Sequence, residues 1–553
     1  SYLVEGENIL AIEVHNVTEG SSDLTALPFL SFAVKDELII WTDVLPAWFP
    51  TTTLTANLHT NFKISTKGEK IYLSDADGIS LDTLFVNVEF ADHSVGCVTD
   101  GATATGIFMF ATPGASNTGA TYDGYTTGEA TFTLDAGFYT GTQITSINVP
   151  AGTEVHYTLN GEIPTLADPL YTSPITIDET QVIKARVFDL AGELLPGQIS
   201  TNTFFIDESI SVPVISISTN NDNLYGGFGI FDNWWNDWKK YAHVEYFDSL
   251  HYNAFEQAVG IKVDGGAGGS RSLEQKSMRV ELDNSAFGDG ELHYPLLKRR
   301  SWVEEYETFY LRNGSNMSNV LPYKDAFMVR TTEGTYNEHM AYEPVVIFIN
   351  GEYWGLYELR NKLDEGHFEN AKGVEGDSLD LLTLSYWYGL VLRTLSGSDT
   401  DFIAMRTYLG TYPTPEDPEF YFIADSLLDL KNFTDYIAAQ MFFANYDWPY
   451  NNIKAWRDRG GDNKWKYALI DVELGLGIGG RSDANADLIP GLFNPQEHIE
   501  PLYNLLKNPI YHDYFVNRYA DLMNSTFLPE RTLAMEDSIY NEVLPEMPRQ
   551  LER

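Results

Sequence analysis

Short runs in which hydrophobic and polar residues alternate fill the first 210 residues of the chain. This period of two is typical of strands that bury one face. Examples are AIEVHN at 11–16 and QVIKARVFD at 181–189, and turn formers such as KG and DADG separate the runs. Beyond residue 210 a longer helical stretch, LKNFTDYIAAQMFFANY at 430–446, joins strand-like runs such as EPVVIFING at 343–351. The pattern therefore predicts a multidomain protein, with all-β units first and an α+β domain after them.

Two β units are expected before the α+β domain, and a fragment of a third precedes them. The alternation at 1–40 predicts the last strands of a β-sandwich whose other strands come earlier, so we expect a processed or truncated chain. The runs at 41–125, which end in TPGASN at 112–117, resemble a lamin-tail domain, a small immunoglobulin-like sandwich. Within this unit DADG at 75–78 is expected to form a tight turn, with Ca²⁺ binding as a weaker alternative.

The second β unit, at 126–208, contains YTLNGEIPT at 157–165 and YTSPITI at 171–177, followed by IKARVF. These motifs resemble the chitobiase C-terminal-type module, a fibronectin-III-like sandwich. The resemblance implies a spacer beside other surface domains. Tyrosines and phenylalanines on its strands are expected to pack in the core rather than to bind sugar.

Charge and composition narrow the choice of partners. The 553 residues include 79 acidic and 35 basic ones, a net charge of −44. Such a charge repels phosphate backbones and argues against nucleic acid, whereas it suits divalent cations and an exposed or saline setting. Cys97 is the only cysteine, so no intrachain disulfide is expected, and no apolar run approaches the roughly 18 residues that a membrane helix needs. We expect a secreted protein or one at the bacterial cell surface.

A glycine-rich segment, GGAGGSR at 265–271, lies between two strand-like runs, AVGIKVD at 258–264 and QKSMRVEL at 275–282. Glycines let backbone N–H groups approach an anion, and a cation that follows can neutralise phosphate charge. A glycine-rich hairpin that binds nothing is the plainer alternative. If the segment covers a nucleotide, the residues expected to contact it are Gly266, Gly268, Gly269, Arg271, Lys276 and Arg279.

The stretch NYDWPYNNIKAWRD starts at Asn445 and overlaps the end of the predicted helix. Its Asp447 and Asn452 are five positions apart, the D-x-x-x-x-N spacing of a kinase catalytic loop. In such a loop the aspartate accepts the proton of the substrate hydroxyl and the asparagine helps to hold Mg²⁺. Because Pro449 cannot continue a helix, both side chains are expected on a loop, where Asn445 and Asn451 are equally plausible ligands. The alternative is a helix end followed by ordinary turn formers.

The run ALIDVELGLG at 468–477 predicts a buried strand that ends in two carboxylates, Asp471 and Glu473. Residues at i and i+2 of a strand point to the same side, where two carboxylates repel each other unless a cation neutralises them. Hard oxygen ligands suit Mg²⁺ or Mn²⁺. The alternative is an edge strand whose acids face solvent. The order of glycine loop, lysine, D-x-x-x-x-N and strand-D-x-E is one that phosphoryl transfer from ATP uses.

Further motifs after residue 209 are YKDAFMVRTTEG at 323–334 and VVIFINGEYWGLYELRNKLDEGHF at 345–368. With the glycine-rich, D-x-x-x-x-N and D-x-E segments, they resemble the CotH kinase family, atypical protein kinases named from bacterial spore-coat proteins. NGEYWGLYEL is the most specific of these motifs. The resemblance implies an α+β kinase-like domain at 209–553.

The same resemblance implies roles for single residues. Asp447 corresponds to the catalytic-loop aspartate, Asn452 to its metal-holding asparagine, and Lys276 to the nucleotide-facing lysine. Asp471 and Glu473 correspond to a D-x-D metal pair. Two positions depart from the family pattern, because Glu473 replaces an aspartate and Asn361 stands where a glutamate is expected.

Three functions are consistent with this sequence. The first is a metal-dependent phosphotransferase that moves a phosphoryl group from ATP to a protein hydroxyl, with Mg²⁺ or Mn²⁺ as cofactor. The second is a non-catalytic surface or adhesion protein, whose inert kinase-like domain and β-modules serve assembly with a partner. The third is carbohydrate binding through tryptophans such as those at 231–247.

Overall fold

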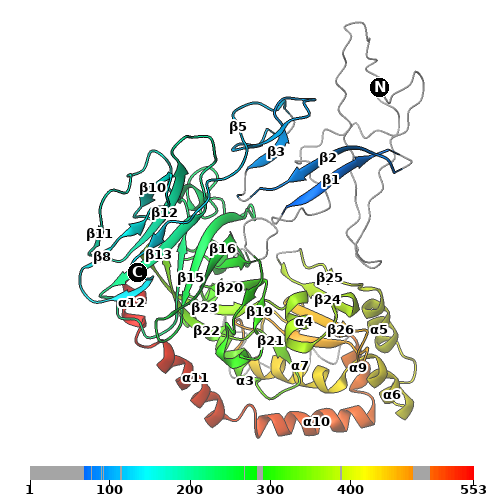
Figure 1. Ribbon diagram of the computed structural model, residues 1–553. Coiled ribbons are helices and arrows are strands. Elements are labelled where there is room, and N and C mark those ends of the chain that lie inside the picture. The colour runs from blue at the N-terminus through cyan, green and yellow to red at the C-terminus, as the bar shows by residue number, and fades with distance from the viewer. Residues whose placement is uncertain are drawn as a thin grey trace. The chain divides into compact units, whose positions relative to one another are not determined.

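The computed structural model describes residues 68–553 except 76–77, 89, 91–92, 113–114, 267, 283–289, 387–388, 478–487 and 489–497 (Figure 1). The predicted sandwich remnant at 1–40 and the start of the lamin-tail-like unit lie outside these residues. The chain divides into two compact units. One ends at Thr127 and includes Phe188–Gly197, and the other contains Gly128–Val187 and Gln198–Arg553.

The first unit contains two small antiparallel sheets in its described part. One pairs β1 (Glu69–Ser74) with β2 (Ser80–Val86), and the other has the order β3 (Ser94–Cys97), β4 (Thr105–Phe108), β5 (Thr121–Tyr122). The chain turns between β1 and β2, where the Asp75 carboxylate accepts the Ile79 N–H at 2.8 Å and its carbonyl accepts the Gly78 N–H at 3.0 Å. These bonds are those of a tight turn, and the lamin-tail assignment stays a prediction.

The second unit begins with a β-module that corresponds to the predicted chitobiase-type sandwich. Its main sheet has the order β10-β12-β13-β7, and two smaller pairs, β11-β8 and β6-β9, complete it. The strands are β6 (Thr131–Phe132), β7 (Gly137–Tyr139), β8 (Gln143–Thr145), β9 (Ile147–Asn148), β10 (Thr153–Thr158), β11 (Ile175–Ile177), β12 (Gln181–Asp189) and β13 (Ile199–Ile206). Apolar residues at alternate positions fill its core, including Ile183, Ala185 and Val187 of β12.

A closed barrel of seven strands follows, in the order β14-β15-β16-β17-β20-β23-β22. The strands are β14 (Val214–Ser218), β15 (Lys240–Phe247), β16 (Asn253–Val263), β17 (Met278–Glu281), β20 (Thr308–Arg312), β22 (Glu343–Ile349) and β23 (Glu352–Asn361). All neighbours are antiparallel except β14 and β22, whose parallel pairing closes the barrel. Every residue of β22 is buried, which explains its nearly unbroken apolar sequence.

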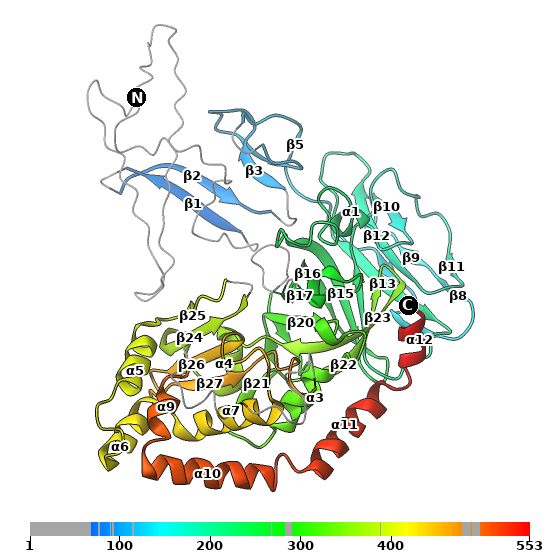
Figure 2. The same cartoon turned by 180° about the vertical axis from the view of Figure 1, so that it is seen from behind.

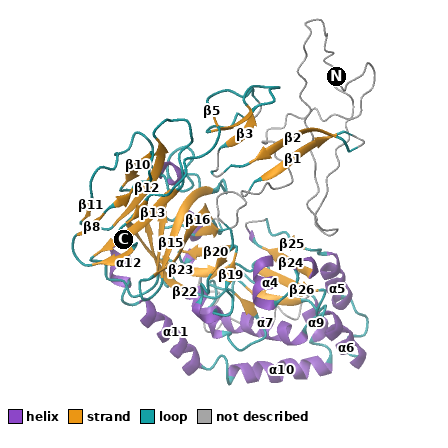
Figure 3. Cartoon of the chain, viewed as in Figure 1, coloured by secondary structure: helices purple, strands orange, loops and turns teal. Residues whose placement is uncertain are grey.

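Beside the barrel lies a five-stranded sheet surrounded by most of the helices (Figure 3). Its order is β21 (Glu338–His339), β27 (Lys466–Leu469), β26 (Ile453–Asp458), β24 (Leu379–Leu384) and β25 (Arg393–Ser396). The helices are α3 (Lys324–Thr331), α4 (Glu365–Lys372), α5 (Thr400–Gly410), α6 (Pro418–Leu427), α7 (Leu430–Phe443), α9 (Pro501–Leu505), α10 (Pro509–Met523), α11 (Pro529–Val543) and α12 (Met547–Glu552). Figure 2 shows α10 and α11 passing along α7 and α3, and α12 reaching β23.

Shorter elements connect these parts. They are α1 (Asn221–Leu224), α2 (Gly269–Ser272), the β18–β19 pair (Leu292–His293 with Glu305–Tyr306), and single turns at Lys298–Arg300, Ser315–Met317 and Gly376–Ser378. None of the helices in the described part of the chain is long and apolar enough to cross a membrane.

Helix α7 confirms the helix predicted at 430–446. Its N-cap Asp429 accepts the N–H groups of Lys431 and Asn432, and Ala444 ends it in the left-handed conformation. The helix therefore stops before Pro449 is reached, and most of its side chains are buried under the five-stranded sheet. Its end starts the loop that carries Asp447.

The β-module and the barrel share one hydrophobic contact. Phe205 of β13 is fully buried, and its ring centroid lies 4.3 Å from that of Phe138, 5.1 Å from Phe247 and 4.9 Å from Phe348. The buried carboxylate of Glu245 on β15 accepts the Thr203 N–H of β13 at 3.0 Å. The module is therefore packed against the barrel rather than tethered to it by a loose linker.

Replacing Phe205 tests this shared contact. Phe205→Ala should lower the free energy of unfolding by about 3–5 kcal/mol, because it removes a fully buried aromatic ring. Urea denaturation followed by tryptophan fluorescence measures the change. Phe228→Ala is the control, since Phe228 is 75% exposed, and its effect should stay within about 0.5 kcal/mol. Equal midpoints for the two variants would contradict a shared core.

Candidate functional site

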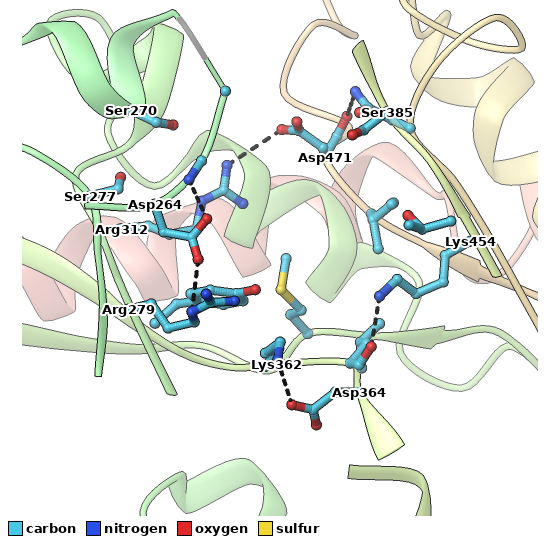
Figure 4. A pocket seen from close by; sticks show the side chains of 18 of the residues that line it. Asp264, Ser270, Ser277, Arg279, Arg312, Lys362, Asp364, Ser385, Lys454 and Asp471 are labelled. Carbon is cyan, nitrogen blue, oxygen red and sulfur yellow. Dashed lines mark hydrogen bonds and ion pairs between the residues drawn. The ribbon is translucent and has the colours of Figure 1, made fainter. Parts of the chain in front are cut away.

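A cavity of about 760 Å³ lies between the barrel and the five-stranded sheet (Figure 4). Its barrel side is lined by the glycine loop between β16 and β17, by β17 itself and by the end of β20. The other side is lined by β24 and by the loops that follow α7 and β27. Several segments that the sequence singled out therefore meet around one cavity.

The glycine loop contributes Gly265, Gly266 and Gly268 to the lining, whereas Gly269 lies outside it. Gly269 packs on the turn after β20, so closely that an added Cβ would lie 2.1 Å from the Ser315 carbonyl oxygen. Its N–H donates to Asn316 Oδ1 at 3.2 Å. Gly269 is therefore needed for packing, whereas Gly265, Gly266 and Gly268 face the cavity.

The three predicted cations of this region are placed differently. Arg279 lines the cavity, and its Nε lies 3.2 Å from Asp264 and 3.0 Å from Glu281. Arg271 is 1% exposed, and it donates to the carbonyl oxygens of Gly265 and Trp234 and to Asp237. The Lys276 ammonium donates to the carbonyl oxygens of Arg271 and Leu273 at 3.0 and 2.9 Å.

Arg271 and Lys276 therefore fix the shape of the loop and do not line the cavity. The sequence could not reveal this, because the carbonyl groups that hold both cations come from turns of the folded chain. Lys276 is not brought together with the carboxylates, in contrast to the role that the family resemblance implied for it.

The loop after α7 brings Asp447 and Asn452 to the cavity. Asp447 Oδ2 accepts the side-chain amides of Asn451 and Asn452 at 2.6 and 3.1 Å. Asn451 also accepts the Tyr386 N–H with Oδ1, so both ends of its amide are engaged. Asn445 is fully buried and bonds Gln440 and the Asp447 N–H. Asn451 and Asn452 both line the cavity, and of these two only Asn452 has an Oδ1 that accepts no hydrogen bond among the described residues.

Asp471 and Glu473 reach the site by a different route from the predicted one. Strand β27 ends at Leu469, and Asp471 has a φ of 49°, so the two acids do not alternate along an extended strand. Asn452 also has a positive φ, 54°. Non-glycine residues adopt this conformation rarely, aspartate and asparagine more readily than others. The left-handed backbone turns Asp471 toward the cavity, where its side chain is 43% exposed, while Glu473 is 2% exposed.

Arg312, at the end of β20, is the cation that neutralises these acids, and the sequence reasoning missed it. Its Nη2 lies 3.4 Å from Asp471 Oδ1 and 3.5 Å from Glu473 Oε2, and its Nη1 lies 3.2 Å from Asp325 Oδ2 (Figure 4 shows the contact with Asp471). A metal ion is therefore not the sole source of positive charge for the acid pair, because a guanidinium already lies between the two carboxylates.

Asp325, on the first turn of α3, connects this cluster. One carboxylate oxygen accepts the Val472 N–H at 2.8 Å, and the other bonds Arg312 and the fully buried Arg360. A strand-borne cation paired with an acid on the next helix is the order of the lysine–glutamate pair in protein kinases. That chain order, β20 then α3, was the signal that could have identified both residues.

Asn361 has no part in this pairing. Its Oδ1 accepts the Ala341 N–H at 2.7 Å, and its Nδ2 lies 3.1 Å from His367 Nδ1. Arg312 therefore does not need a glutamate at position 361, because Asp325 on α3 is its acidic partner.

Two lysines also line the cavity. Lys454 donates to the Leu363 carbonyl oxygen at 2.6 Å, and burial lowers the pKa of Lys454 to about 8. Lys362 lies 3.0 Å from Asp364. In Figure 4 these lysines lie on other sides of the cavity than Arg312.

The negative charge of Asp325, Asp471 and Glu473 exceeds the positive charge of Arg312 and Arg360. Burial raises the pKa values of Asp471 and Glu473, Asp325 raises both further, and Arg312 opposes the change. Asp447 also raises the pKa of Asp471, and Asp471 raises that of Glu473. Burial acts the same way on Asp325, but Arg312 and Arg360 outweigh it and hold the pKa of that carboxyl below its usual range. An additional cation at the cavity edge would relieve this imbalance.

Some of the oxygen-bearing side chains at this cavity are suited to bind a divalent cation. Asp471, Asn452 and Asp447 present oxygens to one cavity, and carboxylate and amide oxygens suit Mg²⁺ or Mn²⁺. Glu473 does not fit as it stands, because Oε1 accepts both the Asn316 N–H and its side-chain amide and Oε2 faces Arg312. Among the described residues no three His, Cys, Asp or Glu side chains form a closed metal cluster. An open site with Asp471 and Asn452 as ligands therefore fits.

The barrel supplies a glycine loop and a strand-borne cation, and loops that carry carboxylates face them across the cavity; protein kinases also combine these parts. The family model described as CotH kinase protein matches residues 261–553, more than half of the chain, and the chain belongs to that family. The model of the chitobiase/beta-hexosaminidase C-terminal domain matches 134–197. A search of curated proteins found no match. The predicted order of β-rich domains followed by an α+β kinase-like domain is confirmed.

The charge imbalance predicts a pH-dependent effect of Glu473→Gln. A carboxyl whose pKa is raised by folding binds its proton more tightly in the folded state, so its contribution to stability falls as the pH rises above the ordinary glutamate value of about 4.3. The variant should match the native protein at pH 5 and exceed its free energy of unfolding near pH 8.5. The expected gain is on the order of 1 kcal/mol, the equivalent of one pKa unit.

Thermal melts between pH 5 and 8.5 measure this difference. Glu416→Gln, which removes an exposed carboxylate far from the cavity, is the matched control. A Glu473→Gln variant that loses stability equally at every pH would show that the hydrogen bonds of Glu473 outweigh its repulsion with Asp471.

Proposed function

We propose that this protein is a metal-dependent phosphotransferase that moves the γ-phosphoryl group of ATP to a hydroxyl of a protein substrate. One observation carries the proposal: Asp447, Asn452 and Asp471, from two separated loops, line the same cavity as the glycine loop. At about 760 Å³ that cavity falls in the range of small-molecule sites, about 300–1,000 Å³.

Asp447 is proposed to orient the acceptor hydroxyl and to take its proton as the oxygen attacks the γ-phosphorus and ADP leaves. The amides of Asn451 and Asn452 both donate to Asp447 Oδ2, which holds the carboxylate in one orientation. Oδ2 is therefore the anchored oxygen, and Oδ1 is the one we assign to the substrate. Catalysis of this kind depends mainly on positioning and charge compensation.

The phosphates are proposed to lie between the glycine loop and the cationic side chains. Backbone N–H groups at Gly266 and Gly268 can approach an anion closely, and Arg279 and Lys454 add positive charge on the lining. Asp471 and Asn452 are the residues that would hold Mg²⁺ or Mn²⁺, which would neutralise the phosphate charge when bound. Arg312 keeps Asp471 facing this space.

A bacterial cell-surface or secreted location is proposed from the net charge of −44 and from the chitobiase-type module next to the kinase-like domain. Because ATP is scarce outside cells, the reaction would precede export or act on proteins in the periplasm. The substrate would be a protein that shares this location. The proposal does not involve nucleic acid, since a charge of this sign repels it.

Incubation with labelled ATP and Mg²⁺ or Mn²⁺ tests the activity. Asp447→Ala should lower the rate of phosphoryl transfer by about 10²–10⁴-fold, the usual contribution of a positioned acid–base group. It should leave the metal-dependent thermal stabilisation by ATP in place. Asp471→Ala should lose that stabilisation as well, because it removes a proposed metal ligand.

Asp513→Ala is the control, since the Asp513 side chain on α10 is 83% exposed and takes no part in the cavity. Transfer that continues at the native rate in Asp447→Ala would overturn the assignment of Asp447. The absence of any stabilisation by ATP with either metal would overturn the proposal as a whole. Stabilisation by a polysaccharide instead would favour the carbohydrate-binding alternative.

A further inference from the structure

A second cavity, of about 480 Å³, lies along α3, which contributes Ala326, Val329 and Arg330 to its lining. It is lined by the end of α3, the segment that follows it, the turn at 298–300 and the end of α4. None of its residues takes part in the proposed phosphoryl transfer, and Met340 is the only residue that lines both cavities.

The lining of this cavity is cationic in a strongly acidic protein. Arg299, Arg300, Arg330 and Lys372 contribute four positive charges, against two acids, Glu333 and Glu338. A net positive lining in a chain of net charge −44 is unexpected from composition.

Most of these charges compensate one another. Arg299 lies 3.0 Å from Glu333, and Arg300 lies 2.5 Å from Glu338, which also pairs with Lys372. His339 adds no cation, because burial and the nearby Arg300 lower its pKa to about 4. Glu333 and Glu338, the two acids of the lining, thus already have cationic partners.

Arg330 is the cation that these acids do not match. It is 4% exposed, and its Nε has no hydrogen-bond partner in the described part of the chain. The nearest acid is Glu542 on α11, 3.9 Å from Nη1 and therefore beyond hydrogen-bond distance. Leaving a buried guanidinium N–H unsatisfied costs free energy, so such a group indicates a missing partner.

Asn337, which lines the same cavity, also has buried polar atoms without hydrogen-bond partners in the described part of the chain. Both its Nδ2 and its Oδ1 are buried without a hydrogen-bond partner among the described residues. One orphaned donor can be an accident of packing, but a buried arginine and a buried amide that line one cavity point to a ligand that satisfies both. Arginine and amide N–H groups together match the oxygens of phosphate or carboxylate, and the hydroxyl of a protonated phosphate or of citrate can donate to Asn337 Oδ1.

We propose that this second cavity is a binding site for a small multiply charged oxyanion, a phosphate or carboxylate compound, with Arg330 and Asn337 as its principal ligands. Arg300 and Lys372 supply the surrounding positive field. Trp302, which is 66% exposed on the same lining, offers a ring face to an organic part of the ligand.

The test is a thermal-shift titration of the full chain with inorganic phosphate, and in a second series with citrate. Divalent metals are left out and the ionic strength is held constant with chloride, since phosphate and citrate also stabilise proteins by exclusion from the surface. A binding site gives a rise in melting temperature that saturates. The series that saturates at the lower concentration identifies phosphate or carboxylate as the preferred group.

Arg330→Gln should raise the apparent dissociation constant of the anion at least tenfold. Asn337→Leu keeps the volume and removes both polar atoms, so it should also weaken binding while leaving the ligand-free melting temperature unchanged or higher. This second variant keeps the test decisive if Arg330→Gln folds poorly. Arg279→Gln, at the other cavity, should keep the native titration.

Two outcomes would overturn the proposal. One is a native protein that shows no saturable shift with either anion. The other is a shift that Arg279→Gln abolishes and Arg330→Gln and Asn337→Leu retain, which would assign the anion to the first cavity.

Discussion

The guanidinium of Arg312 is the constraint on which the arrangement of the domain depends. It extends from a barrel strand and contacts acids from α3 and from the segment after β27. Removing one partner of a buried ion pair leaves an uncompensated charge, which costs several kcal/mol, about 3–5. The ion pairs of Arg312 therefore fix the positions of the barrel, α3 and the segment after β27 relative to one another, and this keeps the shape of the cavity.

The same cluster contains more acidic than basic side chains. Arg312 and Arg360 face Asp325, Glu358, Asp471 and Glu473, and burial raises the pKa values of the last two. Functional sites often retain such unfavourable charge, because it creates affinity for a ligand of opposite sign. Asp471 of the acid cluster lines the first cavity, and Arg330, whose nearest acid is Glu542 at 3.9 Å, lines the second. Charge imbalance of opposite sign thus distinguishes the two cavities.

Much of the fold was predictable from local patterns. Alternating runs predicted strands such as β12 and β16, and the apolar stretch at 430–446 predicted α7, because the hydrophobic period is a property of neighbouring residues. Barrel closure was not predictable in this way. It depends on the parallel pairing of β14 with β22, which are far apart in the sequence. The direct packing of the β-module on the barrel through Phe205 likewise had no local signal.

At the site, the sequence by itself determined which oxygen-bearing side chains could meet, since the spacing of Asp447 and Asn452 and the position of Asp471 after a strand are written in short segments. The tertiary structure alone decided which cation they meet. It holds Arg271 and Lys276 among the carbonyl groups of the glycine loop and brings Arg312 to the acids instead. The physical reason is that a long cationic side chain goes where buried acceptors compensate its desolvation. The folded loop itself supplies those acceptors for Lys276, and the distant Trp234 and Asp237 add acceptors for Arg271.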